Sequence, residues 1–200
     1  VQSPFVQQAA RKLTSNLVTD VKEKTRKALR RIIFEAIRDG DAPAQAQKLI
    51  RRVIGLTTRD AIALKSFERA QRTAATTQRL RALAERRVER YSAKLLRNRA
   101  LSIARTETIR AGNAGRQAAW REMQRDGLID TRSFVQEWMV TPDDRLCPDC
   151  APMEGQQSPL GSDFEQTQRG VLPSDREPIA GDTVESPPLH PNCRCTFVAA

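Results

Sequence analysis

All four cysteines and the only histidine of the chain fall between residues 147 and 195. Cys147 and Cys150 lie in the segment CPDC, and His190, Cys193 and Cys195 lie in the segment HPNCRC. Thiolate sulfur and imidazole nitrogen are preferred ligands of zinc, and two cysteines separated by two residues are typical of a tight turn around a tetrahedral ion. The sequence therefore predicts a zinc site that uses four of these five residues.

The identity of the fourth ligand depends on the backbone around Cys193 and Cys195. In a regular strand the two side chains would point to opposite faces, so only one could bind. A turn at Pro191-Asn192 could instead bring both sulfur atoms to the metal. We expect Cys147, Cys150 and His190 to bind together with either Cys193 or Cys195.

A site dominated by thiolates indicates a structural ion, because a catalytic zinc keeps one position open for water. Two disulfides or free thiols are the alternatives. Disulfides suit secreted chains, and no secretory signal is recognisable at the start of this sequence.

Other residues that could do chemistry are few. The single histidine is assigned to the metal, and the chain has neither a Walker-type phosphate loop nor a G-x-S-x-G motif. Glu107 is expected to pair with Arg105 or Arg110 in the helical body, and Asp143-Asp144 to form a turn. We therefore expect no catalytic residues and no enzyme activity. A zinc nuclease that uses these carboxylates is the alternative.

The elements that must position these residues are divided by proline. Only Pro4 and Pro43 precede Pro142, and the other nine of the eleven prolines follow from there. The proline-free run 44–141 is rich in Ala, Arg, Leu and Gln, which predicts long helices. We expect a helix end at Gly40, helix starts at Pro43 and Thr57, and a further helix end at Asp126-Gly127.

Two details of the helical part can be tested directly. Gly112 and Gly115 would allow a bend or a close helix crossing. The first helical segment is predicted to bury one stripe of apolar residues, made of Val6, Ala10, Leu13, Leu17, Val21, Ala28 and Ile32.

The pattern changes after residue 132. Residues 133–140 alternate as a strand does, residues 195–198 form a second short strand candidate, and residues 153–188 are expected to be a long loop. Zinc would hold the two strands together and close that loop. The predicted fold is mainly α, a helical body with a small C-terminal zinc-stapled α+β segment. Its parts are N-terminal amphipathic helices (1–56), a basic helical body (57–132) and the zinc-stabilised segment (133–200).

Charge follows the same division. Residues 1–132 contain 30 Lys and Arg against 13 Asp and Glu, a net of +17, whereas residues 133–200 contain 4 against 11, a net of −7. A basic helical surface can neutralise DNA phosphates or pair with an acidic protein. The candidates for contact with DNA or a partner are Arg97, Arg99, Arg105, Arg110 and Arg116. Trp138 and Phe197 are expected in the core, with an anchoring role in protein contact as the alternative. No apolar run has the length of a membrane span.

Several of these stretches together resemble a known family. RALSIARTETIRAGNAGRQAAW (99–120), EWMVTPDDRLCPDC (137–150) and PPLHPNCRC (187–195) are similar to the phage Mu F-like head morphogenesis family, and IGLTTRDAIAL (54–64) resembles the segment that often precedes them. The resemblance implies a structural minor head protein of a tailed bacteriophage and brings no catalytic residues.

The same resemblance implies a location inside the virion head near the portal vertex, and in the host cytoplasm during assembly. The implied partners are the portal and other head proteins, and the implied roles are head assembly and DNA packaging or ejection. A virion protein that binds double-stranded DNA without sequence specificity is the alternative function.

Overall fold

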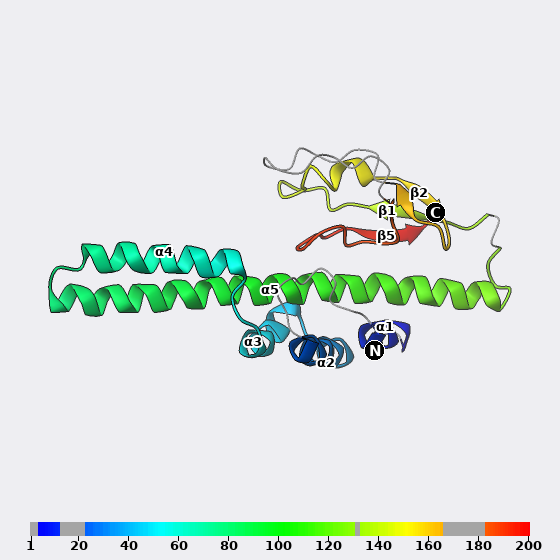
Figure 1. The fold of residues 1–200 in the computed structure, drawn as a ribbon. Helices are drawn as coiled ribbons and strands as arrows, with labels where there is room; N and C mark the ends of the chain where they lie inside the picture. The colour runs from blue at the N-terminus through cyan, green and yellow to red at the C-terminus, as the bar shows by residue number, and fades with distance from the viewer. Residues whose placement is uncertain (1–3, 13–22, 131–132, 166–182) are drawn as a thin grey trace.

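The computed structural model describes residues 4–12, 23–130, 133–165 and 183–200. Its elements in chain order are α1 (Pro4–Lys12), α2 (Glu23–Asp39), α3 (Pro43–Val53), α4 (Thr58–Ala74), α5 (Gln78–Arg125), β1 (Val135–Met139), the 3₁₀ turn η1 (Ala151–Met153), β2 (Gln157–Pro159), β3 (Phe164–Glu165), β4 (Thr183–Val184) and β5 (Thr196–Ala199). The fold is mainly helical with a small C-terminal sheet. Helix α5 runs the length of the molecule, with α1–α3 on one side and the strands on the other (Figure 1).

The helix ends predicted from the sequence are confirmed. Helix α2 ends at Gly40, which has a φ of 74°, and the N–H of Asp41 donates to the carbonyl of Ala36 at 2.8 Å. The hydroxyl of Thr57 accepts the N–H of Asp60 at 3.1 Å. A second cap, which was not predicted, is formed by the hydroxyl of Thr77, which accepts the N–H of Leu80 at 3.3 Å. These caps begin α4 and α5, and Asp126-Gly127 ends α5.

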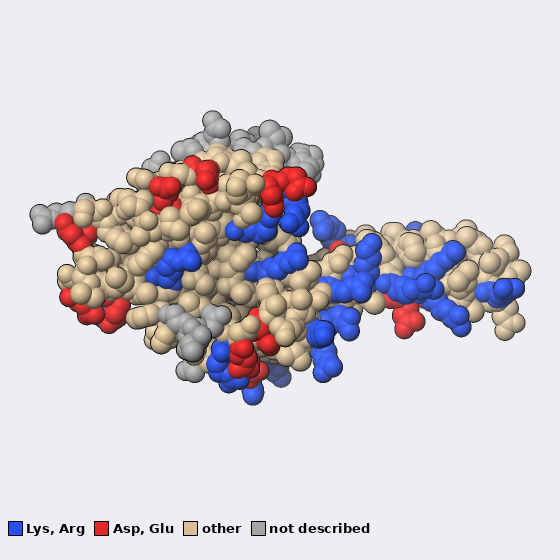
Figure 2. Space-filling view, turned by 180° about the vertical axis from the view of Figure 1, so that it is seen from behind, with Lys and Arg blue, Asp and Glu red and all other residues tan. Residues whose placement is uncertain are grey.

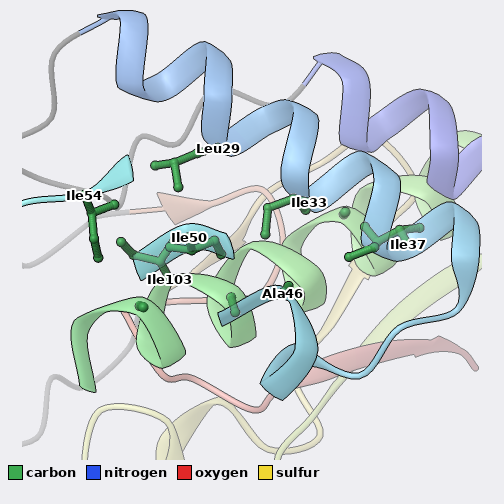
Figure 3. Close-up of a cluster of buried hydrophobic side chains, with 11 residues drawn as sticks. Leu29, Ile33, Ile37, Ala46, Ile50, Ile54 and Ile103 are labelled. Atoms are coloured by element: carbon green, nitrogen blue, oxygen red, sulfur yellow. The ribbon is translucent and has the colours of Figure 1, made fainter. Parts of the chain in front are cut away.

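The first core lies between α2, α3 and one face of α5. Leu29 and Ile50 are fully buried in it, beside Ile33, Ile37, Ala46, Ile54 and Ile103 (Figure 3). The predicted stripe is therefore shifted by one residue in α2, because Leu29 and Ile33 are buried whereas Ala28 and Ile32 lie at the half-buried edge. Both sets have helical spacing, and only the approach of α3 and α5 selects between them. The part of the stripe at residues 13–22 falls outside the described residues.

The predicted close crossing occurs at Gly115. A Cβ atom there would lie 2.4 Å from Cα of Val6, so α1 crosses α5 at a distance that only glycine permits. A Cβ atom at Gly112 would have no other atom within 4 Å, so a larger residue would fit at this position.

The first half of α5 pairs with α4 in a hairpin that projects beyond the rest of the molecule (Figure 1). Phe67 and Tyr91 pack across it with ring centroids 4.7 Å apart. Helix α4 buries no residue completely, and Ala75 and Ala84 are the only buried apolar residues of the hairpin. We call residues 58–99 the arm.

The second core lies under the C-terminal sheet, whose strand order is β2-β1-β5 with both pairings antiparallel. Trp138 of β1 and Phe197 of β5 are directly opposite each other and fully buried, beside Phe164 and Met153. Trp120 of α5 packs against this core with its ring tilted relative to that of Phe197, and the two ring centroids are 5.3 Å apart. Trp138 and Phe197 are thus core residues.

The expected long loop at 153–188 is wrong in its described parts. It contains β2, which completes the sheet beside β1, and the pair β3–β4. Strands of two or three residues are too short to leave an alternating pattern in the sequence. β2 pairs with the edge of β1 that β5 leaves free, whereas β3 and β4 pair with each other. Residues 166–182 lie outside the described residues. The boundaries at 56/57 and 132/133 fall between α3 and α4 and between α5 and β1.

Candidate metal centre

Two turns of the same form bring the predicted ligands together. The N–H of Cys150 donates to the carbonyl of Cys147 at 3.1 Å, and the N–H of Cys193 donates to that of His190 at 3.1 Å. The second turn has Asn192 at a φ of 64°, a conformation that asparagine adopts more readily than most residues. A cavity of about 30 Å³ between the turns is lined by all five candidate ligands.

The ligand atoms form one continuous cluster. Nε2 of His190 lies 3.0 Å from Sγ of Cys147 and 3.1 Å from Sγ of Cys150, and Sγ of Cys150 lies 3.7 Å from Sγ of Cys193. Cys195 joins Cys150 and Cys193 in a group whose sulfur atoms all lie within 4.8 Å of one another. The cluster could hold a metal ion, and none of the four cysteines forms a disulfide.

Both Cys193 and Cys195 face the cluster because strand β5 begins only at Thr196. The residues before it are not a regular strand, so their side chains do not alternate between faces. Of the two backbone geometries weighed from the sequence, the structure has the turn at Pro191-Asn192.

The backbone sets the orientation of the histidine ring. Nδ1 of His190 lies 2.8 Å from the carbonyl oxygen of Pro191. A carbonyl only accepts hydrogen bonds, so Nδ1 carries the proton and Nε2 directs its lone pair at the sulfur atoms of Cys147 and Cys150. Histidines that bind metals are commonly oriented in this way.

Electrostatics within the cluster favour a cation. Hydrogen bonds from the thiols of Cys150 and Cys195 lower the pKa of Cys193, whereas the hydrogen bond to Cys193 and burial raise the pKa of Cys150. Cys150 lowers the pKa of Cys195, but Cys193 and burial outweigh this and raise it to about 12. Buried thiols this close together cannot all ionise unless a positive charge lies among them.

The two turns are also tied together outside the cluster. The guanidinium of Arg194 donates two hydrogen bonds to the carboxylate of Asp143, one of them 2.5 Å long. Asp143 also accepts the N–H of Arg145 at 3.0 Å, which confirms its predicted place in a turn. The hydrogen bond from Arg194 holds the pKa of Asp143 well below its usual range.

Helix α5 binds the C-terminal segment through buried polar side chains. These side chains were not predicted from the sequence. Nδ2 of Asn113 donates to the carbonyl of Pro187 at 3.0 Å, and its Oδ1 accepts the hydroxyl of Thr196 at 2.9 Å. The hydroxyl of Thr106 accepts the N–H of Asn192 at 2.9 Å. The available signal was the spacing of Thr106, Asn113 and Gln117, three polar residues on one helix face.

The five arginines proposed for external contact have different surroundings. Arg97 and Arg105 are exposed. Arg99 donates to the carbonyl of Gly55 at 2.7 Å, and Arg110 pairs with Glu107 at 3.5 Å. Arg116 remains exposed but donates to Thr196 and to the carbonyl of Phe197, both at 2.6 Å. Contact of these five with DNA or a partner stays a prediction.

Glu107 has the structural role expected for it. Its side chain is buried and pairs with Arg110, one of the two predicted partners. Burial raises its pKa, and the charge of Arg110 lowers it by less.

Comparison with curated proteins finds no match, and neither does comparison with solved structures. A family model described as Phage Mu protein F like protein matches residues 27–198. The match runs from α2 to the end of β5, and it includes the arm, the long helix and all five residues of the cluster. The chain therefore belongs to the Phage Mu protein F like family.

Proposed function

We propose that the chain is a structural protein of a tailed-phage head, in which a zinc ion holds the C-terminal segment against the long helix. The observation that carries this proposal is the family match across both the helical body and the cysteine–histidine cluster. The chemistry of the cluster agrees with it, because a thiolate-rich shell around one ion leaves no position for water.

Zinc fits the donor set better than other common metals. Three thiolates and one imidazole suit its tetrahedral coordination, whereas Mg²⁺ and Ca²⁺ prefer oxygen ligands. We assign the ligands to Cys147, Cys150, His190 and Cys193, which close the two matching turns. Bound zinc would offset most of the negative charge of the three thiolates and cross-link the two turns.

Two of the three carboxylates weighed for catalysis, Glu107 and Asp143, support a structural role. Glu107 is buried and paired with Arg110, and Asp143 is held by Arg194. A general base must reach a substrate proton, and neither side chain is free to do so. In the described part of the chain, no helix has the length and apolar character needed to cross a membrane.

We propose further that the protein assembles with the portal and other head proteins near the portal vertex, and acts in head assembly and DNA packaging or ejection. The test is co-sedimentation with portal oligomers at low and high salt in the absence of DNA. Binding that survives high salt is expected for a head-assembly component. If the chain sediments only when DNA is added, the portal assignment is wrong.

A further inference from the structure

The arm carries most of its charge on exposed surface that no described part of the chain covers. Residues 58–99 contain 12 Lys and Arg against 4 Asp and Glu, a net of +8. All of these cations except Arg99 are exposed. Seen from behind, basic side chains run along the projecting hairpin with little acidic surface between them (Figure 2).

Four of the cations of α5 lie along one face of the helix. Four exposed arginines are separated by seven, four and seven residues, a spacing that returns to the same face: Arg79, Arg86, Arg90 and Arg97. We call these four the arginine stripe. The acids of the same stretch, Glu85 and Glu89, fall outside it, and no ion pair joins the stripe to a carboxylate in the described part of the chain.

The dimensions of the stripe fit a regular polyanion. Arg79 and Arg97 are about 27 Å apart along α5 at ~1.5 Å per residue. One turn of B-DNA is ~34 Å, and its phosphates place a negative charge every ~1.7 Å of helix axis. A straight cationic stripe of this length can therefore contact several phosphates at once.

The surface is suited to phosphates more than to an acidic protein. Protein interfaces usually bury an apolar or aromatic centre within a polar rim. Near the stripe two large apolar side chains are exposed, Leu80 at 42% and Leu83 at 38%, and the aromatic Tyr91 is turned towards α4. Backbone contact with DNA requires only positioned cations and reads no sequence.

We propose that the arm binds the phosphate backbone of double-stranded DNA through the arginine stripe, without sequence specificity. The inference goes beyond the proposed function and does not rest on it, because charge, spacing and exposure of the arm carry it. It differs from the prediction made from sequence: of the five arginines named there, only Arg97 belongs to the stripe, and Arg99, Arg110 and Arg116 have partners within the molecule.

The experiment measures binding to two labelled 30-base-pair duplexes of unrelated sequence by fluorescence anisotropy over a range of salt concentrations. The stripe variant replaces Arg79, Arg86, Arg90 and Arg97 with Gln, which keeps helix propensity. The matched control makes the same change of charge on exposed cations outside the arm, at Lys27, Lys48, Arg51 and Arg52. Circular dichroism checks that both variants keep their helix content.

Wild-type protein is expected to bind both duplexes equally, with affinity that falls steeply as salt rises. The stripe variant should bind more than ~10-fold more weakly at low salt, and its salt slope should be shallower by ~3 to 4, since each lost phosphate contact removes ~0.9. The salt slope of the control variant should differ from that of wild-type protein by less than ~0.9, the value of one phosphate contact.

Three results would overturn the inference: wild-type affinity in the stripe variant, an equal loss in the control, or displacement of the duplex by poly-glutamate as effectively as by unlabelled DNA. The last result would assign the arm to an acidic protein. Portal co-sedimentation without DNA is measured separately, so this inference and the proposed head function can fail independently.

Discussion

Cys193 and Cys195 are two residues apart, yet their sulfur atoms have different surroundings. Cys193 closes the turn from His190 and lies 3.7 Å from Sγ of Cys150. Hydrogen bonds from the neighbouring thiols lower its pKa. The pKa of Cys195 is instead raised to about 12. The turn that Cys193 closes and its short distance to Sγ of Cys150 argue that Cys193 is the fourth ligand.

Replacing these two cysteines one at a time tests that assignment. Cys193→Ser is expected to lose the bound zinc, because one thiolate of the shell is gone, whereas Cys195→Ser should retain one zinc per chain. The measurement is metal content of purified protein by mass spectrometry. Zinc retained in Cys193→Ser and lost in Cys195→Ser would reverse the assignment.

Glu107 makes stability depend on pH in a direction opposite to most carboxylates. Burial raises its pKa in the folded chain above the ordinary value of 4.5. The folded state therefore binds the proton more tightly than the unfolded state, and this contribution to stability is present below pH 4.5 and lost as pH rises through the folded pKa.

Glu107→Gln removes that titration. Relative to wild-type protein, the variant is expected to gain stability as the pH is raised from 4.5 to 7, measured as the difference between their midpoints of thermal unfolding at each pH. The zinc ligands are common to both proteins and cancel in the difference. Glu89→Gln, which changes an exposed glutamate of the arm, is the control and should leave the difference flat. A flat difference for Glu107→Gln would contradict the raised pKa.

At the scale of elements, helix α5 packs against different parts of the molecule along its 48 residues. Its first half forms the arm with α4. Its second half presents Ala100, Ile103, Ala104 and Ala111 to the first core, and Thr106, Asn113 and Trp120 to the C-terminal segment. A helix used on two faces has no single apolar stripe, and the overall composition of α5 therefore conceals how much of it is buried.

The two glycines of α5 give a matched pair of substitutions. Gly115→Ala is expected to destabilise the packing of α1 by ~1–3 kcal/mol, because the new methyl group would overlap the backbone of Val6. Gly112→Ala is expected to stabilise the helix by ~0.5–1 kcal/mol, since its added methyl group meets no other atom.

Hydrogen exchange of the amides in α1, together with chemical denaturation, measures both effects. Faster exchange of α1 is expected in the Gly115 variant alone. Equal behaviour of the two variants would mean that α1 does not cross α5 at Gly115 in solution.

At the scale of the whole molecule, the zinc segment and the helical body are expected to separate in stability. The segment is under seventy residues and its sheet has three short strands, so its own core is small. The helical body has its own core on the other face of α5. Removing the metal should therefore unfold the zinc segment and leave the helical body folded.

Hydrogen exchange before and after treatment with a chelator tests this expectation. Amides of β1 and β5 should exchange at the rates of unfolded chain once zinc is removed, while those of α2 and α3 keep their protection. Unchanged protection of β1 and β5 in protein shown to be free of metal would mean that zinc does not hold the segment together.

Much of the fold could be predicted because it depends on local chemistry. Gly40, Pro43, Thr57 and Gly127 set helix ends through backbone conformation and capping, which act within one turn of chain. The missed strands β2, β3 and β4 depend on pairing with distant partners. The displaced stripe in α2 and the anchoring role of Asn113 depend in the same way on which elements pack together.

The amino-acid sequence by itself determined the helical character of the chain, the change at residue 132, the family and the five residues that could bind a metal. These follow from residue type and spacing, which do not require knowledge of distant contacts. Only the tertiary structure decided that Cys193 and Cys195 both face Cys150, and that Arg99, Arg110 and Arg116 have partners within the molecule while the arginine stripe is left uncovered. The physical reason is that burial and hydrogen bonding are set by segments far apart in the chain, and folding is what brings them within reach of each other.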